Sequence, residues 1–175
     1  RIANYMADPI LQRRGFQLVP MQKSHVMKFY HDIAPYSAAE YEDVDLFYAL
    51  DKMQEEQDCM VLENQDGISV QLIGLQATGN QQVCMWSLFT KQMDTDWRSV
   101  IRVSPDILRY VHQTYYEINL NISAESEGSL NWASWLGFTP TGYIDDEDGT
   151  TLVHFVRCNP DRKNVYALAS RPVMH

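Results

Sequence analysis

The side chains that could carry acid–base chemistry are spread along the sequence and form no recognised catalytic motif. Glu63 and Glu117 are carboxylates suited to a general base, and Tyr143 carries a hydroxyl that could protonate a leaving group. The sequence contains no Gly-x-Ser-x-Gly elbow, no Gly-x-x-x-x-Gly-Lys loop and no His-Glu-x-x-His pattern. We therefore take Glu117 and Tyr143 forward as candidate catalytic residues, on residue type and approximate position.

Several other polar residues are better explained by structure than by chemistry. His112 and His154 stand among apolar neighbours, where a histidine is usually a packed structural residue. The acid run at 145–148 lacks the spacing of a calcium-binding loop and predicts a solvated turn. The cysteines are odd in number and far apart, which indicates reduced thiols: Cys59, Cys84 and Cys158. No metal site is expected.

The composition is that of an acidic globular protein. The chain has 175 residues, enough for one domain with a sizeable core. It has 14 Lys and Arg against 23 Asp and Glu, and this net charge of −9 disfavours binding to nucleic acid. Because neither a long apolar run nor a secretory signal is visible, we expect no membrane span and a cytoplasmic location, in a host cell or virion if the chain is of phage origin.

Hydrophobic periodicity and turn residues predict the element order β-α-α-β-β-β-α-β-α-β-β. The first strand is expected at 16–21, the second helix at about 39–54, and the third helix from Ser104-Pro105-Asp106. The buried faces of the first two helices are expected to carry Val26, Phe29, Tyr30 and Ile33, and Val44, Phe47, Leu50 and Met53. The order predicts an α/β domain at 16–158, with a mixed, mostly antiparallel sheet flanked by helices. An N-terminal arm at 1–15 and a C-terminal tail at 159–175 lie outside it.

The stretch "SAESEGSLNWASWLGFTPTGYIDDEDGTTLVHFV" reads as a polar helix that ends in Leu136-Gly137-Phe138, followed by a closing hairpin. Together with the element order, it resembles the GNAT superfamily of N-acetyltransferases over roughly residues 16–158. The short domain predicted here is also similar to small acetyltransferase-like proteins of tailed bacteriophages, some of them virion-associated. The resemblance implies an acyl-CoA N-acyltransferase-like fold.

The resemblance also implies a place for acetyl-CoA. In this family the cofactor lies between the fourth and fifth strands, and its pantetheine forms hydrogen bonds with the exposed edge of the fourth strand. The diphosphate lies on backbone N–H groups at the start of the next helix. The residues that correspond to the cofactor site are Ser87, Leu88, Phe89, Thr90, Lys91 and Arg98.

The sequence departs from the family at two positions that matter for activity. The diphosphate loop usually contains glycines, whereas here it reads "KQMDTDWRS", in which Asp94 and Asp96 would repel a diphosphate. The tyrosine that often protonates the leaving thiolate corresponds to Ala133, which has no proton to donate. These differences predict weakened binding of acetyl-CoA.

Two functions remain open. The first is that of a GNAT-fold protein with a degenerate acyl-CoA site, used by a tailed phage as an interaction or virion component. The second is an active acetyl-CoA-dependent N-acetyltransferase that modifies a protein or small-molecule amine. The two arms favour protein partners because they contain the basic residues Arg1, Arg13, Arg14, Arg162, Lys163 and Arg171.

Overall fold

The computed structural model describes residues 8–42, 44–56 and 58–162. The strands are β1 (Leu11–Arg13), β2 (Phe16–Pro20), β3 (Asp58–Glu63), β4 (Ser69–Gly79), β5 (Gln82–Phe89), β6 (Glu117–Ser123), β7 (Thr139–Asp145) and β8 (Thr151–Cys158). The helices are α1 (Lys23–Asp32), α2 (Pro35–Ala38), the 3-10 helix η1 (Ala39–Tyr41), α3 (Leu46–Glu56), α4 (Met93–Val111) and α5 (Glu127–Trp135). None of the described helices is both long and apolar enough to cross a membrane.

The predicted α/β class is confirmed. The strands of the described chain form an 8-stranded sheet in the order β1-β2-β3-β4-β5-β6-β8-β7. β5 and β6 run parallel, whereas the pairs β1–β2, β2–β3, β3–β4, β6–β8 and β7–β8 are antiparallel. The sheet is therefore mixed and mostly antiparallel, with helices packed against it.

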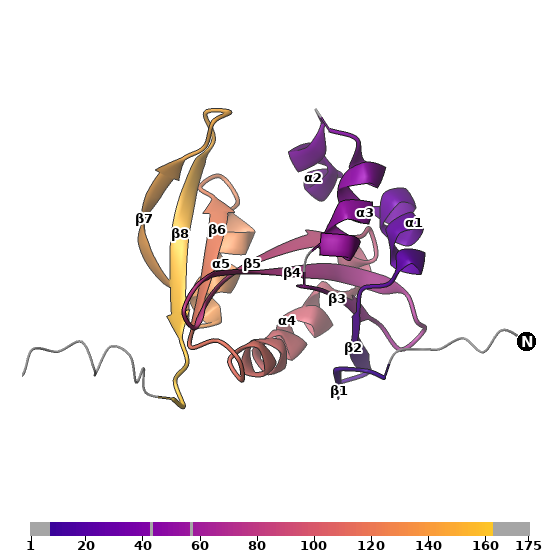
Figure 1. Ribbon diagram of the computed structural model, residues 1–175, viewed down its shortest axis with the longest axis horizontal. Helices are drawn as coiled ribbons and strands as arrows, with labels where there is room; N and C mark the ends of the chain where they lie inside the picture. Colours follow the sequence, from indigo (N-terminus) through magenta and orange to yellow (C-terminus); the bar gives the residue numbers. More distant parts are fainter. Residues whose placement is uncertain (1–7, 43, 57, 163–175) are drawn as a thin grey trace, which may run out of the picture. The chain divides into compact units, whose positions relative to one another are not determined.

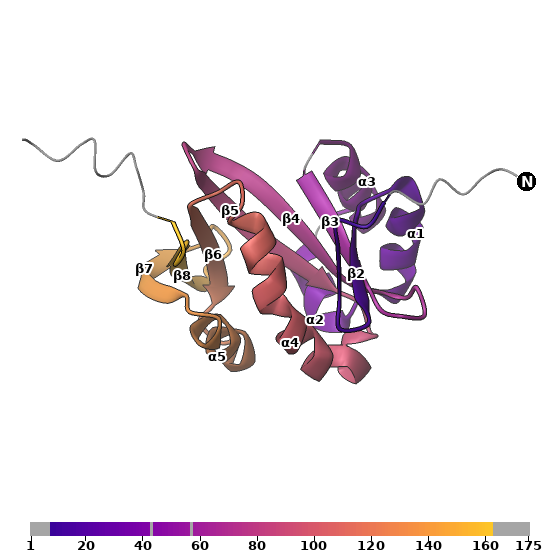
Figure 2. The same ribbon diagram turned by 90° about the horizontal axis from the view of Figure 1, so that it is seen from below.

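The chain divides into two compact units. The first unit comprises Arg1–Gln76 and Met85–Ile107, and the second comprises Ala77–Cys84 and Leu108–His175. In the first unit, α1 and α3 cover one face of β2, β3 and β4, and α4 lies on the other face (Figure 1, Figure 2). In the second unit, β6, β8 and β7 lie side by side with α5 packed beside them (Figure 1). The expected domain at 16–158 includes parts of both units.

The sheet begins earlier than the sequence predicts. Leu11–Arg13 pair with β2 around a two-residue turn, in which Arg14 has φ 53° and Gly15 has φ 80°. Such turns are usually recognised by Asn-Gly or Asp-Gly, and an arginine with positive φ is uncommon, so the sequence gives no clear signal here. The expected arm at 1–15 therefore contains a strand, and its residues 1–7 lie outside the described chain.

The second predicted helix is interrupted. Instead of one helix at about 39–54, the chain forms α2, η1 and α3, and Asp45 Oδ1 accepts a hydrogen bond from Tyr48 N at 3.1 Å at the start of α3. Leu50 and Met53 are buried as predicted, but Val44 and Phe47 are exposed. The break changes which residues face the sheet, so half of the predicted apolar stripe points outward. Tyr30 of α1, also predicted to be buried, is exposed as well.

The third predicted helix starts eleven residues earlier than expected. α4 begins at Met93 and contains Pro105 in its interior, whereas the sequence suggested that this proline marks the first turn. A proline inside a helix costs about 3 kcal/mol. Val100, Val103 and Ile107 form one buried stripe that continues past it, and their burial offsets this cost. Most of the expected diphosphate loop is therefore helical.

The end of α5 and the final hairpin agree with the sequence. α5 is followed by Gly137 with φ 87°, the left-handed residue expected after a helix. Gly149, with φ 84°, forms the tip of the β7–β8 hairpin, where Asp146 N donates to Thr150 O at 2.8 Å. The acid run at 145–148 is exposed at this tip.

Candidate functional site

The expected pantetheine edge is the last part of β5, in the first unit. Thr90 N donates to Val70 O of β4 at 3.0 Å, so the preceding residue directs its backbone groups to the opposite edge. There, Phe89 N donates to Ser37 Oγ at 3.0 Å, and Phe89 O accepts from Ala34 N at 2.8 Å. At this position the edge is bonded to the chain's own α1–α2 segment, residues 32–37.

The α1–α2 segment extends along the site towards α4. The Tyr36 ring lies 6.1 Å from the Phe89 ring, in a tilted arrangement. Burial raises the pKa of Tyr36, and the charge of Asp94 in the first turn of α4 raises it further. Asp32 O accepts a hydrogen bond from Lys91 N at 2.8 Å. The segment thus contacts both the end of β5 and the connection to α4.

The backbone amides at the start of α4 are engaged within the chain. The first amides of a helix normally lack intrahelical acceptors, and this makes them suitable for phosphate. Here Gln92 N donates to Thr90 Oγ1 at 3.3 Å. The next four amides form tight turns: Met93 N to Thr90 O at 3.1 Å, Asp94 N to Lys91 O at 3.1 Å, Thr95 N to Gln92 O at 3.1 Å and Asp96 N to Gln92 O at 3.0 Å. Each amide from 92 to 96 therefore already has an acceptor.

The charge at the start of α4 also opposes a diphosphate. Asp94 and Asp96 both lie in its first turn. Asp96 Oδ2 is held in place by Asn64 Nδ2 at 3.1 Å and by Gln92 Nε2 at 3.3 Å. Two negative charges at this place would repel the phosphates of acyl-CoA, although they favour the helix itself. Together with the engaged amides, these charges disfavour a diphosphate at this helix start.

The predicted cofactor residues lie together in the first unit, but several of their side chains have structural partners. Ser87 Oγ accepts from Gln71 Nε2 at 2.9 Å, and Thr90 Oγ1 donates to Ser69 O at 2.7 Å. Leu88 is buried in the core. Lys91 and Arg98 are exposed, and the Arg98 guanidinium lies over the Trp97 ring, 5.1 Å from its centroid. Among the six predicted cofactor residues, these two are the cations that could contact an anion.

The two candidate catalytic residues are not brought together in the second unit. Glu117 pairs in register with Gln82, the first residue of β5, and its Oε2 accepts from Asn119 Nδ2 at 3.2 Å. Tyr143 is 78% exposed on β7 and lies level with Ile122 of β6 through β8. The positions are five residues apart along the sheet, about 17 Å. Glu117 and Tyr143 therefore do not form an acid–base pair.

A buried pair that the sequence did not reveal lies in the first unit. His25 Nε2 is 3.9 Å from Glu63 Oε2, and both side chains are almost fully buried. His25 Nδ1 accepts a hydrogen bond from Gln22 N at 2.9 Å, which places the ring proton on the nitrogen that faces Glu63. Burial, with a contribution from Lys28, lowers the pKa of His25 to about 4. Burial also raises the pKa of Glu63, against the opposing effects of Lys28 and Gln17. The sequence named Glu63 alone, because its partner is 38 positions away.

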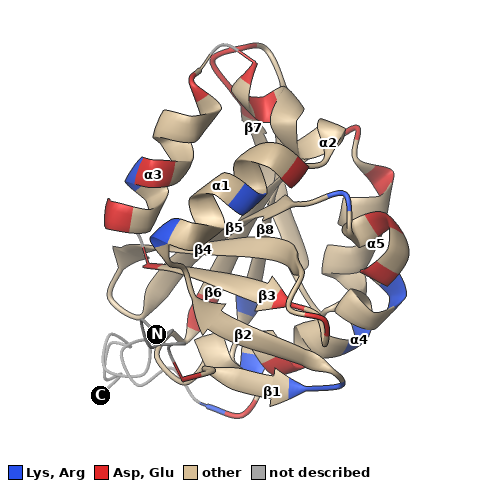
Figure 3. Cartoon of the chain, turned by 90° about the vertical axis from the view of Figure 1, so that its right-hand side faces the viewer, with Lys and Arg blue, Asp and Glu red and all other residues tan. Residues whose placement is uncertain are grey.

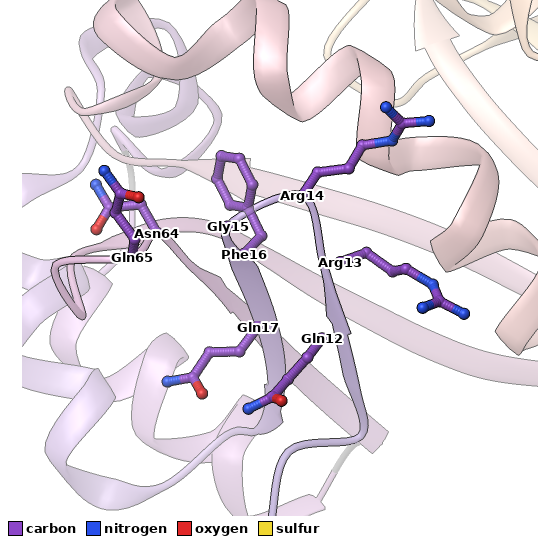
Figure 4. A pocket seen from close by; sticks show the side chains of 8 residues that line it. All are labelled: Gln12, Arg13, Arg14, Gly15, Phe16, Gln17, Asn64 and Gln65. Atoms are coloured by element: carbon purple, nitrogen blue, oxygen red, sulfur yellow. The ribbon is translucent and has the colours of Figure 1, made fainter.

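A surface hollow of about 440 Å³ lies beside the β1–β2 turn. It is lined by Gln12, Arg13, Arg14, Gly15, Phe16, Gln17, Asn64 and Gln65. Figure 4 shows the Arg13 and Arg14 side chains extending to one side of the hairpin and the Asn64 and Gln65 side chains on the other. The polar side chains that line the hollow do not point toward a common position. Within the described ranges, no group of three His, Cys, Asp or Glu residues is placed to hold a metal ion.

Comparison with solved structures identifies the fold. An acetyltransferase of the GNAT family from Bacillus anthracis superposes with a TM-score of 0.69 at 11% identity, over 85% of this chain and 97% of that one. A chimera of the spermidine N-acetyltransferase SpeG from Vibrio cholerae and hSSAT gives 0.68 at 10% identity, over 83% and 96%. The ribosomal-protein-S5-alanine acetyltransferase from Vibrio fischeri gives 0.64 at 12%, over 88% and 98%. The chain therefore has the GNAT fold.

The likeness is found by comparing structures, whereas comparisons of the sequence find no match. No protein-family model matches the chain, and no curated protein matches it. Sequence identities of 10–12% are compatible with a common fold but do not carry an activity from one protein to another. Function must therefore be argued from the residues of this chain.

Proposed function

We propose that this chain is a GNAT-fold protein that has lost acyl-CoA binding and acts through contacts with other proteins. The observation that supports this most strongly is that its own chain engages the backbone groups a cofactor would use. Phe89 is bonded to Ala34 and Ser37, and every amide from 92 to 96 has an acceptor within the chain.

The cost of opening this site supports the same conclusion. A typical hydrogen bond contributes about 1 kcal/mol to stability, and a buried group left unpaired costs more. Acyl-CoA would have to displace both bonds of Phe89 and place its diphosphate beside Asp94 and Asp96. Lys91 and Arg98 offer charge in compensation, but they are solvent-exposed, where charge interactions are weak.

A second function is favoured by the fold itself. The structures of similar fold described above are acetyltransferases, which supports an active acetyl-CoA-dependent N-acetyltransferase acting on a protein or small-molecule amine. Cofactor binding separates the two proposals, because this activity requires acetyl-CoA and the interaction role does not.

Isothermal titration with acetyl-CoA tests the proposal. We expect no heat beyond dilution when the purified chain is titrated to millimolar cofactor, because the backbone donors are engaged and the helix start is acidic. A GNAT-fold spermidine N-acetyltransferase titrated in the same buffer provides the positive control. A saturable isotherm with a micromolar Kd would contradict the proposal and favour the enzyme.

The interaction role that we propose is that of a virion component of a tailed phage. The support for this is the resemblance of the short domain to small acetyltransferase-like phage proteins, together with the basic residues in the terminal segments. Mass spectrometry of purified particles of a phage encoding this chain tests it. We expect peptides of the chain at stoichiometric levels, and their absence from intact particles would remove the virion role.

A further inference from the structure

We propose that an exposed aromatic surface on α1 and α3 binds residues 163–175 of a second copy of this chain. This inference rests on the interaction role proposed above and names the partner. The surface, called the aromatic patch, consists of Met27, Tyr30, Phe47 and Tyr48, which are 47%, 44%, 40% and 60% exposed. Several exposed aromatic and apolar side chains on neighbouring helices are typical of interaction sites.

The aromatic patch extends over two helices, α1 and α3. The rings of Tyr30 and Phe47 meet edge to face, with centroids 5.7 Å apart and planes at 85°. Met27 lies one turn before Tyr30 on α1, so their side chains are neighbours. The opposite faces of the same helices are occupied by the core, where Phe29 and Leu50 are fully buried. The patch is therefore the outer face of a well-packed helix pair, and aromatic residues of this kind are enriched at protein interfaces.

The surroundings of the aromatic patch on α3 are acidic. The described carboxylates of this region are Glu40, Glu42, Asp45, Asp51, Glu55 and Glu56. The one lysine of α3, Lys52, is bound to Glu55 at 3.8 Å and Glu56 at 3.4 Å, and it lies over the Tyr48 ring. Figure 3 shows acidic residues in red along α3, and basic residues in blue on both α1 and α3. The acidic charge of α3 therefore favours a basic partner, and the aromatic patch favours one that also has apolar side chains.

Residues 163–175 have the matching chemistry. The segment "KNVYALASRPVMH" contains no Asp or Glu, and Lys163 and Arg171 are its cations. Its large apolar residues are Val165, Tyr166, Leu168, Val173 and Met174. In a chain with a net charge of −9, a stretch of thirteen residues without an acid complements the surface of α3. The segment lies outside the described residues and is long enough to cross two helices whose axes pack roughly 8–10 Å apart.

A contact of this kind is heterologous, because a segment of one copy binds a different surface of the next. Heterologous contacts close into rings or continue as open chains. Either outcome suits a component of a repetitive particle. The partner that we assign is therefore a second copy of this chain rather than an unrelated protein.

Sedimentation of the full chain over a range of concentrations tests the inference. We expect concentration-dependent association, and we expect Tyr48→Ser and Leu168→Ser each to raise the apparent dissociation constant about tenfold or more. Tyr143→Ser removes a tyrosine of the second unit that is 78% exposed, more than Tyr48, and is the control, for which association should be unchanged. Circular dichroism confirms that each variant is folded.

Exchanging the charges of one residue on α3 and one in the segment 163–175 distinguishes a direct contact from a general effect on folding. Asp51→Arg and Arg171→Glu should each weaken association, and the two together should restore part of it, because the pair is then reversed rather than removed. An excess of the synthetic peptide 163–175 should dissociate the assembly. A chain that stays monomeric throughout, or one that associates equally well with Tyr48→Ser, would overturn the inference. Titration with acetyl-CoA distinguishes this inference from the proposed function. If the chain is monomeric and does not bind acetyl-CoA, only this inference is contradicted. If the chain associates and binds acetyl-CoA, only the proposed function is contradicted.

Discussion

One buried histidine, His25, is expected by itself to lower the free energy of unfolding by roughly 3 kcal/mol between pH 7 and pH 4. Burial lowers its pKa in the folded chain to about 4, from an ordinary value of 6.5. The unfolded chain therefore takes up a proton at higher pH than the folded chain does. The stability is fully present above pH 6.5 and is lost as the pH falls towards 4.

Glu63 acts in the opposite direction. Burial raises its pKa in the folded chain, so as the pH falls the folded state takes up this proton first and gains stability. The groups that face the pair are Lys28, which opposes protonation of both residues, and the uncharged Gln17. The net acid loss in the parent chain should therefore be smaller than the contribution of His25 alone.

Urea denaturation at several pH values measures this effect. His25→Gln keeps an acceptor for Gln22 N but cannot take up a proton, so its unfolding free energy should depend much less on pH between 6.5 and 4. His31→Gln changes an exposed histidine of the same helix and should keep the parent's dependence. Equal slopes for the parent and His25→Gln would show that this histidine does not govern the acid response.

Replacement of Phe29 by alanine is expected to lower the free energy of unfolding by about 4 kcal/mol. Its side chain is 0% exposed and lies in the core cluster with Leu50, Leu72 and Leu88. The loss combines the transfer of the ring with the cavity that remains between α1 and the sheet. Because α1 leads directly into the α1–α2 segment, this packing also supports the contacts of that segment with the end of β5.

Chemical denaturation of Phe29→Ala beside Met27→Ala provides the comparison. Met27 lies on the same helix but is exposed, so its truncation should change stability by less than about 0.5 kcal/mol. A similar loss in both variants would mean that the outer face of α1 is as important for stability as its core face, contrary to the packing described here.

The parts of the fold that the sequence predicted correctly are those with local signals. Gly137 and the Asp148-Gly149 turn were predicted because glycine is favoured where φ is positive. The β1–β2 turn was missed because Arg14 occupies such a position without the usual residue type. α4 was predicted to start too late because Pro105 resembles a first-turn proline. The destabilisation caused by this proline inside the helix is offset by long-range packing, which the sequence does not indicate.

The sequence indicated only some of the features that the structure has at the end of β5 and the start of α4. The acids Asp94 and Asp96 were visible in the sequence as a departure from the expected loop. The closure of the β5 edge was not, because the Phe89 to Ser37 hydrogen bond joins residues 52 positions apart and neither belongs to a motif. The engagement of the amides at 92–96 follows from α4 starting at Met93, which the sequence did not indicate.

The most direct test of the central claim is to follow the backbone amides of Phe89 and residues 92–96 by NMR during an acetyl-CoA titration. These are the groups that the chain's own residues engage. We predict that their chemical shifts stay constant up to millimolar acetyl-CoA. Saturable shifts at these amides, with a single dissociation constant, would show that the cofactor displaces the internal bonds and would contradict the account.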